Sequence, residues 1–308
     1  MNTMNKFILH RARFVSLTFA LLLAVSACQG QTVAPAAAAP PAARVETVKF
    51  ESKLMGQPLP YNVVLPPLYD APESRAVKYP VLYLLHGLAG NSGDWVSNRA
   101  HLAAHAAAYR FIIVTPEGKD GWYTDSATVP TEKFETYILE ELLPDVERRY
   151  RALTTRDARA IAGLSMGGYG ALKFGLKHPE RFTLAASLSG AFDAASWDHT
   201  DPQLHAFVKP SIARTYGALD SSTRAANDLY KLINALPPER IAALPFIYLD
   251  CGTEDFLIGS SREMSALLLK RKIPHEFRQL PGRHNWPYWD AQVQEVLKLA
   301  TRKLRAAQ

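Results

Sequence analysis

The chain has 308 residues, of which 48% are hydrophobic and 21% charged, a balance typical of a globular protein with a core of useful size. The formal net charge is +6, and it falls to about +3 without residues 1–27, which hold three basic residues and no acidic ones. So weak a positive charge argues against a nucleic-acid partner.

Residues 1–27 have the pattern of an export signal. Basic residues come first, residues 14–25 form an apolar run, and Ser26 and Ala27 supply the small side chains expected before a cleavage point. The apolar run is too short to make a comfortable transmembrane helix. We therefore expect these residues to be removed during export.

Cys28 is a candidate lipidation site. The sequence Val-Ser-Ala-Cys at residues 25–28 resembles the bacterial lipobox, in which the cysteine is acylated and becomes the first mature residue. A plain signal peptide with an incidental cysteine is the alternative. Gln29, rather than Asp, follows the cysteine, and by resemblance to Gram-negative lipoproteins this favours the outer membrane. We therefore expect an outer-membrane lipoprotein that faces the periplasm and contacts the membrane only through this anchor. Residues 28–43, rich in Pro and Ala, read as an extended tether, and residues 44–308 as the folded domain.

From residue 44 on, strand-like and helix-like segments alternate. Strands are predicted at residues 45–50, 61–65, 81–85, 111–115, 158–162, 183–188, 246–250 and 276–280. Helices are predicted at residues 131–150 with a kink or break at Pro144, and at 165–176, 224–236, 260–271 and 286–304, with an irregular excursion over 191–240. The alternation indicates an α/β fold, in which a mostly parallel central sheet has helices on both faces. A ligand site is expected at the carboxyl ends of its strands.

The strongest motif is Gly163-Leu164-Ser165-Met166-Gly167, where a short apolar strand gives way to a helix. This is the context of a nucleophile elbow, in which the serine sits on a turn so tight that small residues must flank it. A glycine-rich turn with a capping serine is the alternative. The turn would present the Ser165 hydroxyl to the cleft and place it at a helix N-terminus, where developing negative charge is favoured.

A serine hydroxyl needs a base within hydrogen-bond reach. His284 is the preferred candidate because it lies in a loop between the last predicted strand and the last helix, on the elbow side of the sheet. The other histidines after Ser165 are less suitable: His178 reads as a helix cap, His275 begins a strand, and His199 and His205 lie in the excursion.

The acid that orients the base should follow the strand at 246–250. Asp255 lies far enough into the next loop to reach His284, Asp250 ends the strand, and Glu254 is a weaker third candidate. Position alone favours Asp255. Cys251 lies beside them and reads as a buried, inert thiol.

An oxyanion hole needs two backbone amides. One is expected from Met166, directly after the serine, and the other from the glycine-bearing loop at residues 86–90, with the Leu88 amide as the candidate. An ordinary strand-exit turn is the alternative for that loop. No metal-ligand spacing and no phosphate-binding or dinucleotide motif stands out, so neither a metal nor a cofactor is expected.

These blocks, taken in order, resemble the esterase D family of α/β-hydrolases, which includes S-formylglutathione hydrolases, feruloyl and acetyl esterases, and mycolyltransferases. The resemblance covers residues 50–300 and rests on the following stretches: 84–88, 91–95, 121–125, 163–168, 187–190, 251–255 and 282–286. It implies an α/β-hydrolase fold without a large lid domain, the acid at Asp255 and the second oxyanion amide at Leu88. It also implies that Trp95, Trp122 and Tyr123 lie near the substrate pocket, although all three are equally well explained as core aromatics.

The function expected from these features is that of a serine esterase working through an acyl-enzyme. S-formylglutathione hydrolases are cytosolic, whereas this chain carries an export signal, so a small-molecule or carbohydrate ester outside the cytoplasm fits better. The alternatives are an acyltransferase to a sugar acceptor, a catalytically silent carbohydrate- or partner-binding protein, and a peptidase.

Overall fold

The computed structural model describes residues 43–308. The predicted export signal, Cys28 and all but the last residue of the predicted tether lie outside the described residues. Within the described part of the chain, no helix combines the length and apolar character needed to cross a bilayer.

A central sheet of eight strands, in the order β1-β4-β6-β5-β7-β8-β9-β10, runs through the domain. Its strands are β1 (Arg44–Val48), β4 (Tyr61–Leu65), β5 (Val81–Leu85), β6 (Ile112–Pro116), β7 (Arg159–Leu164), β8 (Leu184–Leu188), β9 (Phe246–Gly252) and β10 (His275–Leu280). Strand β4 is antiparallel to both of its neighbours, and all other pairings are parallel. The prediction of a mostly parallel sheet is confirmed.

The strands read as continuous apolar runs because both faces of the sheet are covered. In β5, Val81, Tyr83 and Leu85 belong to one buried cluster and the intervening Leu82 and Leu84 to another. Since successive side chains point to opposite faces of a strand, a strand covered on both sides needs apolar residues at every position.

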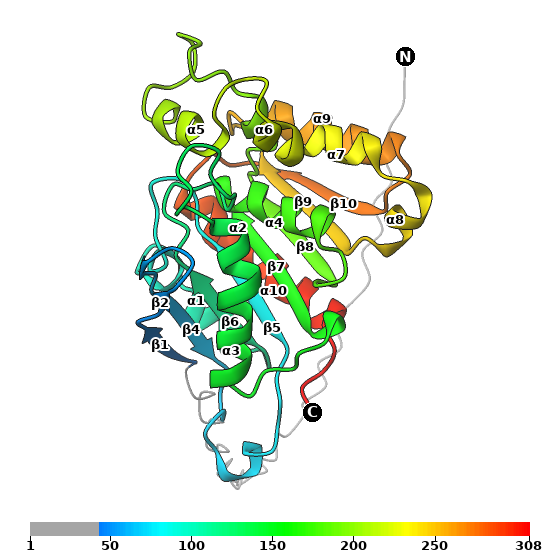
Figure 1. The fold of residues 1–308 in the computed structure, drawn as a ribbon. Helices are drawn as coiled ribbons and strands as arrows, with labels where there is room; N and C mark the ends of the chain where they lie inside the picture. The colour runs from blue at the N-terminus through cyan, green and yellow to red at the C-terminus, as the bar shows by residue number, and fades with distance from the viewer. Residues whose placement is uncertain (1–42) are drawn as a thin grey trace, which may run out of the picture. The chain divides into compact units, whose positions relative to one another are not determined.

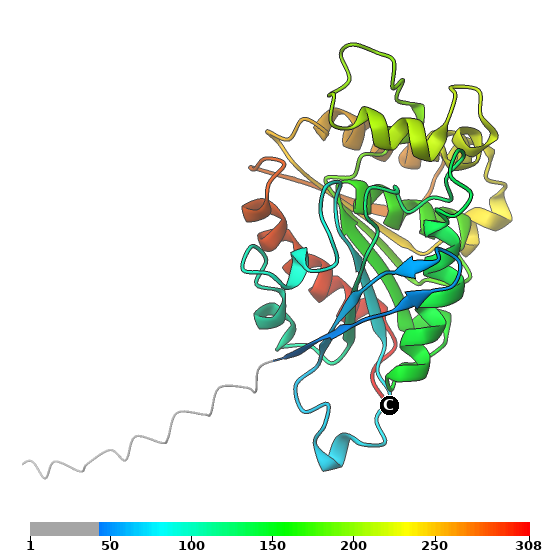
Figure 2. The same ribbon diagram turned by 60° about the vertical axis from the view of Figure 1, so that its left-hand side comes forward.

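Helices cover both faces (Figures 1 and 2). The helices are α1 (Leu102–Ala106), α2 (Phe134–Tyr137), α3 (Leu143–Arg149), α4 (Met166–Lys177), α5 (Lys209–Tyr216), α6 (Ser222–Asn227), α7 (Leu229–Ala235), α8 (Pro238–Ala243), α9 (Ile258–Lys270) and α10 (Trp286–Lys303). Helices α1 and α10 share one buried cluster, whereas α2, α3, α4 and α9 contribute to the other. Figure 2 shows α10, in red, and the green helices on opposite sides of the sheet.

The long predicted helix at 131–150 begins later and is interrupted. It starts at Phe134, and a π-helical segment at Ile138–Leu142 joins α2 to α3. Pro144 lies in the first turn of α3. A proline has no amide hydrogen for the helical ladder, and the widened turn directly before it accommodates this loss.

The excursion contains four short helices, α5 to α8, rather than one. The helix predicted at 224–236 is broken at Asp228, whose side chain accepts a hydrogen bond of 3.1 Å from the Lys231 amide and begins α7. Helix α1 and the small hairpin of β2 (Glu51–Ser52) and β3 (Gln57–Pro58) were not predicted. No large lid domain is present in residues 43–308.

Candidate active site

Ser165 occupies the sharp turn between β7 and α4. Its backbone angles are φ 53° and ψ −116°, a conformation that costs energy for a residue with a Cβ. The turn is held by a hydrogen bond of 2.9 Å from the Ser165 amide to the carbonyl of Leu188 on the neighbouring strand. The predicted elbow is therefore present, and strain of this kind gathers at functional sites.

Two glycines make the turn possible. A Cβ at Gly163 would lie 2.4 Å from the Gly167 carbonyl oxygen, and a Cβ at Gly167 would lie 2.6 Å from the carbonyl oxygens of Leu85 and His86. These are backbone atoms that cannot move aside, so larger residues at either position would force the turn open. This explains the small residues two positions before and after Ser165.

Ser165, His284 and Asp255 form one hydrogen-bonded chain. His284 Nε2 lies 3.0 Å from Ser165 Oγ, and His284 Nδ1 lies 2.9 Å from Asp255 Oδ2. The three side chains come from the turn after β7, the loop after β9 and the loop after β10, all at the carboxyl ends of parallel strands. The arrangement has the geometry of a base that is oriented by an acid and faces a hydroxyl.

Asp255 is suited to remain ionised. It is buried, and Oδ1 accepts a hydrogen bond of 2.8 Å from the Leu257 amide. Burial alone would raise the pKa of this carboxyl, but the hydrogen bond and charge of His284 outweigh it, so the net pKa is below the usual value. A charged carboxylate here fixes which nitrogen of His284 carries its proton.

The structure does not bring the other candidate acids to His284. Asp250 is buried among Tyr248 and Tyr288, whose hydroxyls donate to it, and Glu254 accepts a hydrogen bond from the Gly282 amide. Glu254 thereby ties the loop that carries Asp255 to the loop that carries His284.

The remaining histidines after Ser165 also have other partners. His178 ends α4 and its ring bonds to Glu135 at 2.9 Å, His275 bonds to Ser265 at 2.8 Å, and His199 lies 3.5 Å from Arg224. His205 lies on the pocket wall described below. Cys251 is a buried free thiol, and burial raises its pKa to about 12, as expected of an inert cysteine.

The loop after β5 lies against the serine. A Cβ on Gly87 would be 3.3 Å from the Ser165 Cβ, and a hydrogen bond of 3.1 Å from the Gly90 amide to the Gly87 carbonyl closes the loop. Leu88 lies on the pocket wall, and Met166 directly follows the serine as the first residue of α4. The two predicted oxyanion donors therefore belong to segments that meet at Ser165.

The buried side chain of His86 fixes this loop through hydrogen bonds. Its Nε2 accepts a hydrogen bond of 2.9 Å from the Gly118 amide, which leaves Nδ1 to donate to the Gly87 carbonyl at 2.8 Å. The side chain is buried, and the Tyr123 hydroxyl donates to its carbonyl at 3.0 Å. These contacts give His86 a structural role beneath the loop.

A cavity of about 460 Å³ opens at Ser165 and His284, a size usual for small-molecule sites. Its wall is mainly apolar, with Leu88, Trp122, Trp197, Phe207, Phe256 and Trp286 among the residues that line it. Asp94, Arg99 and His205 add polar groups. The site can therefore hold an apolar group next to the hydroxyl.

The three aromatic residues expected near the pocket have different places. Trp122 lines the cavity, and its indole N–H donates to Ser211 Oγ at 3.0 Å. Trp95 and Tyr123 are fully buried and are not part of the cavity wall. The Trp95 indole donates to the Leu85 carbonyl at 3.1 Å, so the structure places Trp95 and Tyr123 beneath the loop that faces Ser165.

Two residues beside His284 were missed. Its ring contacts two aromatic rings, that of Phe256 with centroids 4.6 Å apart and that of Trp289 with centroids 4.8 Å apart. A signal for Trp289 was present in the sequence. Trp286 and Trp289 are three residues apart at the start of α10 and so share a helix face, directly after the loop that carries His284.

Comparison with known proteins places the chain in a family. Residues 52–299 match the family model described as "Putative esterase". The chain is 28% identical over 258 residues to an acetyl esterase of Caldicellulosiruptor saccharolyticus, a match that covers 80% of this chain and 94% of the relative.

Solved structures agree with this match. A ferulic acid esterase superposes with a TM-score of 0.72 at 29% identity, over 85% of this chain and 99% of the other. An S-formylglutathione hydrolase from Staphylococcus aureus superposes with a TM-score of 0.71 at 25% identity, over 84% and 99%. The resemblance and the fold expected from the sequence are both confirmed, and the chain belongs to this esterase family of α/β-hydrolases.

Proposed function

We propose that this protein is an exported serine esterase, which cleaves a carboxylic ester through an acyl-enzyme formed on Ser165. Membership of the esterase family supports ester hydrolysis as the reaction. The observation that carries the serine mechanism is the hydrogen-bonded chain from Ser165 Oγ through His284 to Asp255, at the mouth of an apolar cavity.

The first half of the reaction forms the acyl-enzyme. Ser165 Oγ attacks the ester carbonyl while His284 Nε2 accepts the hydroxyl proton, and the Asp255 carboxylate stabilises the resulting imidazolium. The amides of Leu88 and Met166 donate to the oxygen of the tetrahedral intermediate, at the positive end of α4. His284 then gives its proton to the departing alcohol.

The second half releases the acid. Water takes the place of the alcohol, His284 accepts a proton from it, and the hydroxide attacks the acyl carbonyl. The Ser165 oxygen leaves with the proton returned from His284, which restores the starting state. A sugar hydroxyl in place of water would make the same enzyme an acyltransferase.

The substrate we propose is a small-molecule or sugar-linked ester whose acyl part enters the apolar cavity. The names of the similar acetyl and ferulic acid esterases support an ester of this kind. A mainly apolar wall suits an apolar acyl group, and Asp94, Arg99 and His205 offer polar contacts to the alcohol part.

Turnover of p-nitrophenyl acetate by wild type and Ser165→Ala tests the mechanism. We expect the variant to lose roughly 10⁴-fold or more in kcat and to stop reacting with a fluorophosphonate probe. Activity of the variant within tenfold of wild type would refute the assignment. Methyl ferulate and acetylated xylan, assayed with and without sugar acceptors, separate the possible substrates and separate hydrolysis from acyl transfer.

Export and lipidation at Cys28 are a separate part of the proposal. Because the lipobox-like residues 25–28 end at this cysteine, wild type should appear in the membrane fraction and Cys28→Ser should not. Equal distribution of the two proteins would remove the anchor from the proposal without affecting the catalytic assignment.

A further inference from the structure

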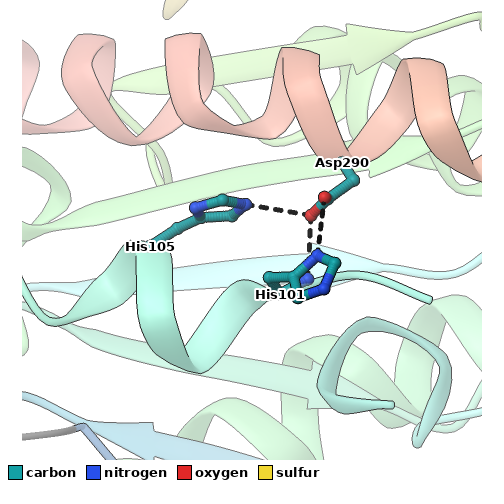
Figure 3. A group of neighbouring side chains, drawn as sticks. All are labelled: His101, His105 and Asp290. Carbon is teal, nitrogen blue, oxygen red and sulfur yellow. Dashed lines mark hydrogen bonds and ion pairs between the residues drawn. The ribbon is translucent and has the colours of Figure 1, made fainter. Parts of the chain in front are cut away.

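His101, His105 and Asp290 form a cluster on the side of the domain where α1 meets α10 (Figure 3). His101 directly precedes α1, His105 lies in its last turn, and Asp290 lies in the opening turns of α10. Figure 3 shows both imidazole rings directed at the one carboxylate. The aspartate lies 185 residues from His105 in the sequence, which is why the sequence alone gave no metal-ligand set.

The nitrogen and oxygen atoms of the cluster are close enough to share an ion. His101 Nδ1 lies 2.8 Å from Asp290 Oδ2, His105 Nε2 lies 2.9 Å from Asp290 Oδ1, and one ligand atom from each residue can be chosen so that all lie within 4.8 Å of one another. Ligand atoms about 2.1 Å from a tetrahedral zinc are roughly 3.4 Å apart. Small side-chain rotations would therefore bring the three atoms into a coordination sphere.

We propose that His101, His105 and Asp290 bind a divalent transition-metal ion of the zinc type, which fastens α1 to the start of α10. Two imidazoles and one carboxylate are ligands that zinc prefers, whereas calcium and magnesium take mainly oxygen ligands. His101 would bind through Nδ1 and His105 through Nε2, and each ring would keep its proton on the other nitrogen.

The carboxylate is prepared for this role. Both imidazole rings donate to it, His101 Nδ1 to Oδ2 and His105 Nε2 to Oδ1. Oδ1 also accepts a hydrogen bond of 2.8 Å from the His101 amide, which fixes the carboxylate against the start of α1. Asp290 therefore presents a charged and oriented ligand.

The three ligands lie on or directly beside two helices that pack in the same buried cluster. Leu102 and Ala106 anchor α1 in the buried cluster to which Trp289 and Val293 of α10 also belong. The side chain of His101 is 64% exposed, and those of His105 and Asp290 are 19% exposed, so an ion can enter from solvent. Three protein ligands leave a fourth position for water.

The proposed ion would stabilise rather than catalyse. None of the three ligands lines the cavity at Ser165. Asp290 is next in sequence to Trp289, whose ring contacts His284, so an ion here would strengthen the attachment of the segment that supports His284. This inference does not depend on the proposed esterase mechanism.

Untagged protein stripped with a chelator and titrated with ZnCl₂ in a calorimeter tests the proposal. We expect one zinc per chain and a rise in Tm with zinc, with no comparable effect of Ca²⁺ or Mg²⁺. The visible absorption of added Co²⁺ should show tetrahedral coordination. Affinity should fall about tenfold or more in His105→Ala and Asp290→Asn, and should be unchanged in the control His275→Ala.

Equal zinc affinity in wild type and Asp290→Asn would overturn the proposal, because the ion would then lie elsewhere, for example on His284. A lack of zinc binding or of any rise in Tm would overturn it as well. If Asp290→Asn does not fold, His101→Ala decides the question, since that side chain is largely exposed.

Discussion

The indole ring of Trp289 stands at 88° to the imidazole of His284, with 4.8 Å between the ring centroids. The indole N–H donates to Ser189 Oγ at 3.1 Å, which fixes the plane of the tryptophan. Phe256 contacts the same imidazole at 4.6 Å. We therefore expect the two aromatic rings to limit the rotation of His284 and help to keep Nε2 directed at Ser165.

Replacement of Trp289 should therefore disturb catalysis more than substrate binding. In Trp289→Leu the imidazole can tilt away from the serine, and we expect kcat for p-nitrophenyl acetate to fall at least about tenfold, with a smaller change in KM. Trp289→Phe keeps a ring beside His284 but loses the hydrogen bond to Ser189 and part of the ring volume, so it should retain more activity than the leucine variant. Wild-type kcat in the leucine variant would contradict this positioning role.

Matched amide substitutions at Asp255 and Asp250 test which of the two aspartates is the catalytic acid. Asp255→Asn removes the charge that orients His284 and should lower kcat/KM by roughly 10³- to 10⁴-fold. Asp250→Asn changes a carboxyl that contacts Tyr248 and Tyr288 instead and should remain within a few-fold of wild type. Steady-state kinetics of the two variants at the same pH decide the assignment, and the reverse order of activities would transfer the acid role to Asp250.

Asp250 should also make stability depend on pH. Burial raises the pKa of Asp250, and the hydrogen bonds from Tyr288 and Tyr248 lower it. Burial is the larger effect, and the net pKa is about 6. Because the folded state holds this proton more tightly than the unfolded chain, the stabilisation is complete below the unfolded pKa of about 4 and is lost as pH rises through about 6.

The measurement is the free energy of unfolding in urea at pH 4.5 and 7.5. Asp250→Asn has no proton to lose, so its stability relative to wild type should improve by about 2 kcal/mol from the lower to the higher pH. If the free energies of unfolding of wild type and Asp250→Asn differ by the same amount at both pH values, Asp250 is not the cause of the pH dependence.

The sequence predicted the parts of the site that depend on strict local requirements. Backbone atoms approach Gly163 and Gly167 so closely that no side chain fits, and this constraint is visible as the spacing around Ser165. Likewise, β5 is apolar at every position because helices cover both of its faces. A continuous apolar run of this length therefore predicts a buried parallel strand from the sequence.

The features that could not be predicted from the sequence depend on contacts that are formed only in the folded chain. Helix α1 has five residues and gains its stability from packing against α10, so its own periodicity is too short to be recognised. Trp95 and Tyr123 looked suitable for a pocket, but only the fold shows that their polar atoms face the backbone of residues 85 and 86. The break at Asp228 depended on one side chain that caps a new helix.

The close approach of Gly87 to the serine leads to a further prediction. A methyl group there would lie 2.6 Å from Leu164 Cδ1 and 3.3 Å from the Ser165 Cβ, so Gly87→Ala should push the loop outward and weaken the oxyanion donors. We expect kcat to fall roughly 10²-fold. Gly259→Ala is the matched control, because a methyl group in that helix meets nothing within 4 Å and should leave activity unchanged while adding about 0.5–1 kcal/mol of stability. Equal activity of both alanine variants would show that this loop does not act in the reaction.

Phe207 should select for the length of the acyl group. It is 67% exposed although it lines the cavity, which leaves a large apolar surface for a substrate to cover. Phe207→Ala should lower kcat/KM for p-nitrophenyl hexanoate by about fivefold, because roughly 1 kcal/mol of apolar contact is lost. The acetate ester is too short to depend on that contact and should be hydrolysed almost as before. Leu269→Ala, at an equally exposed position outside the cavity wall, is the control. A proportional loss on both esters would mean that Phe207 supports the site as a whole, whereas a loss confined to the longer ester would establish this rim as the part of the pocket that measures the acyl chain.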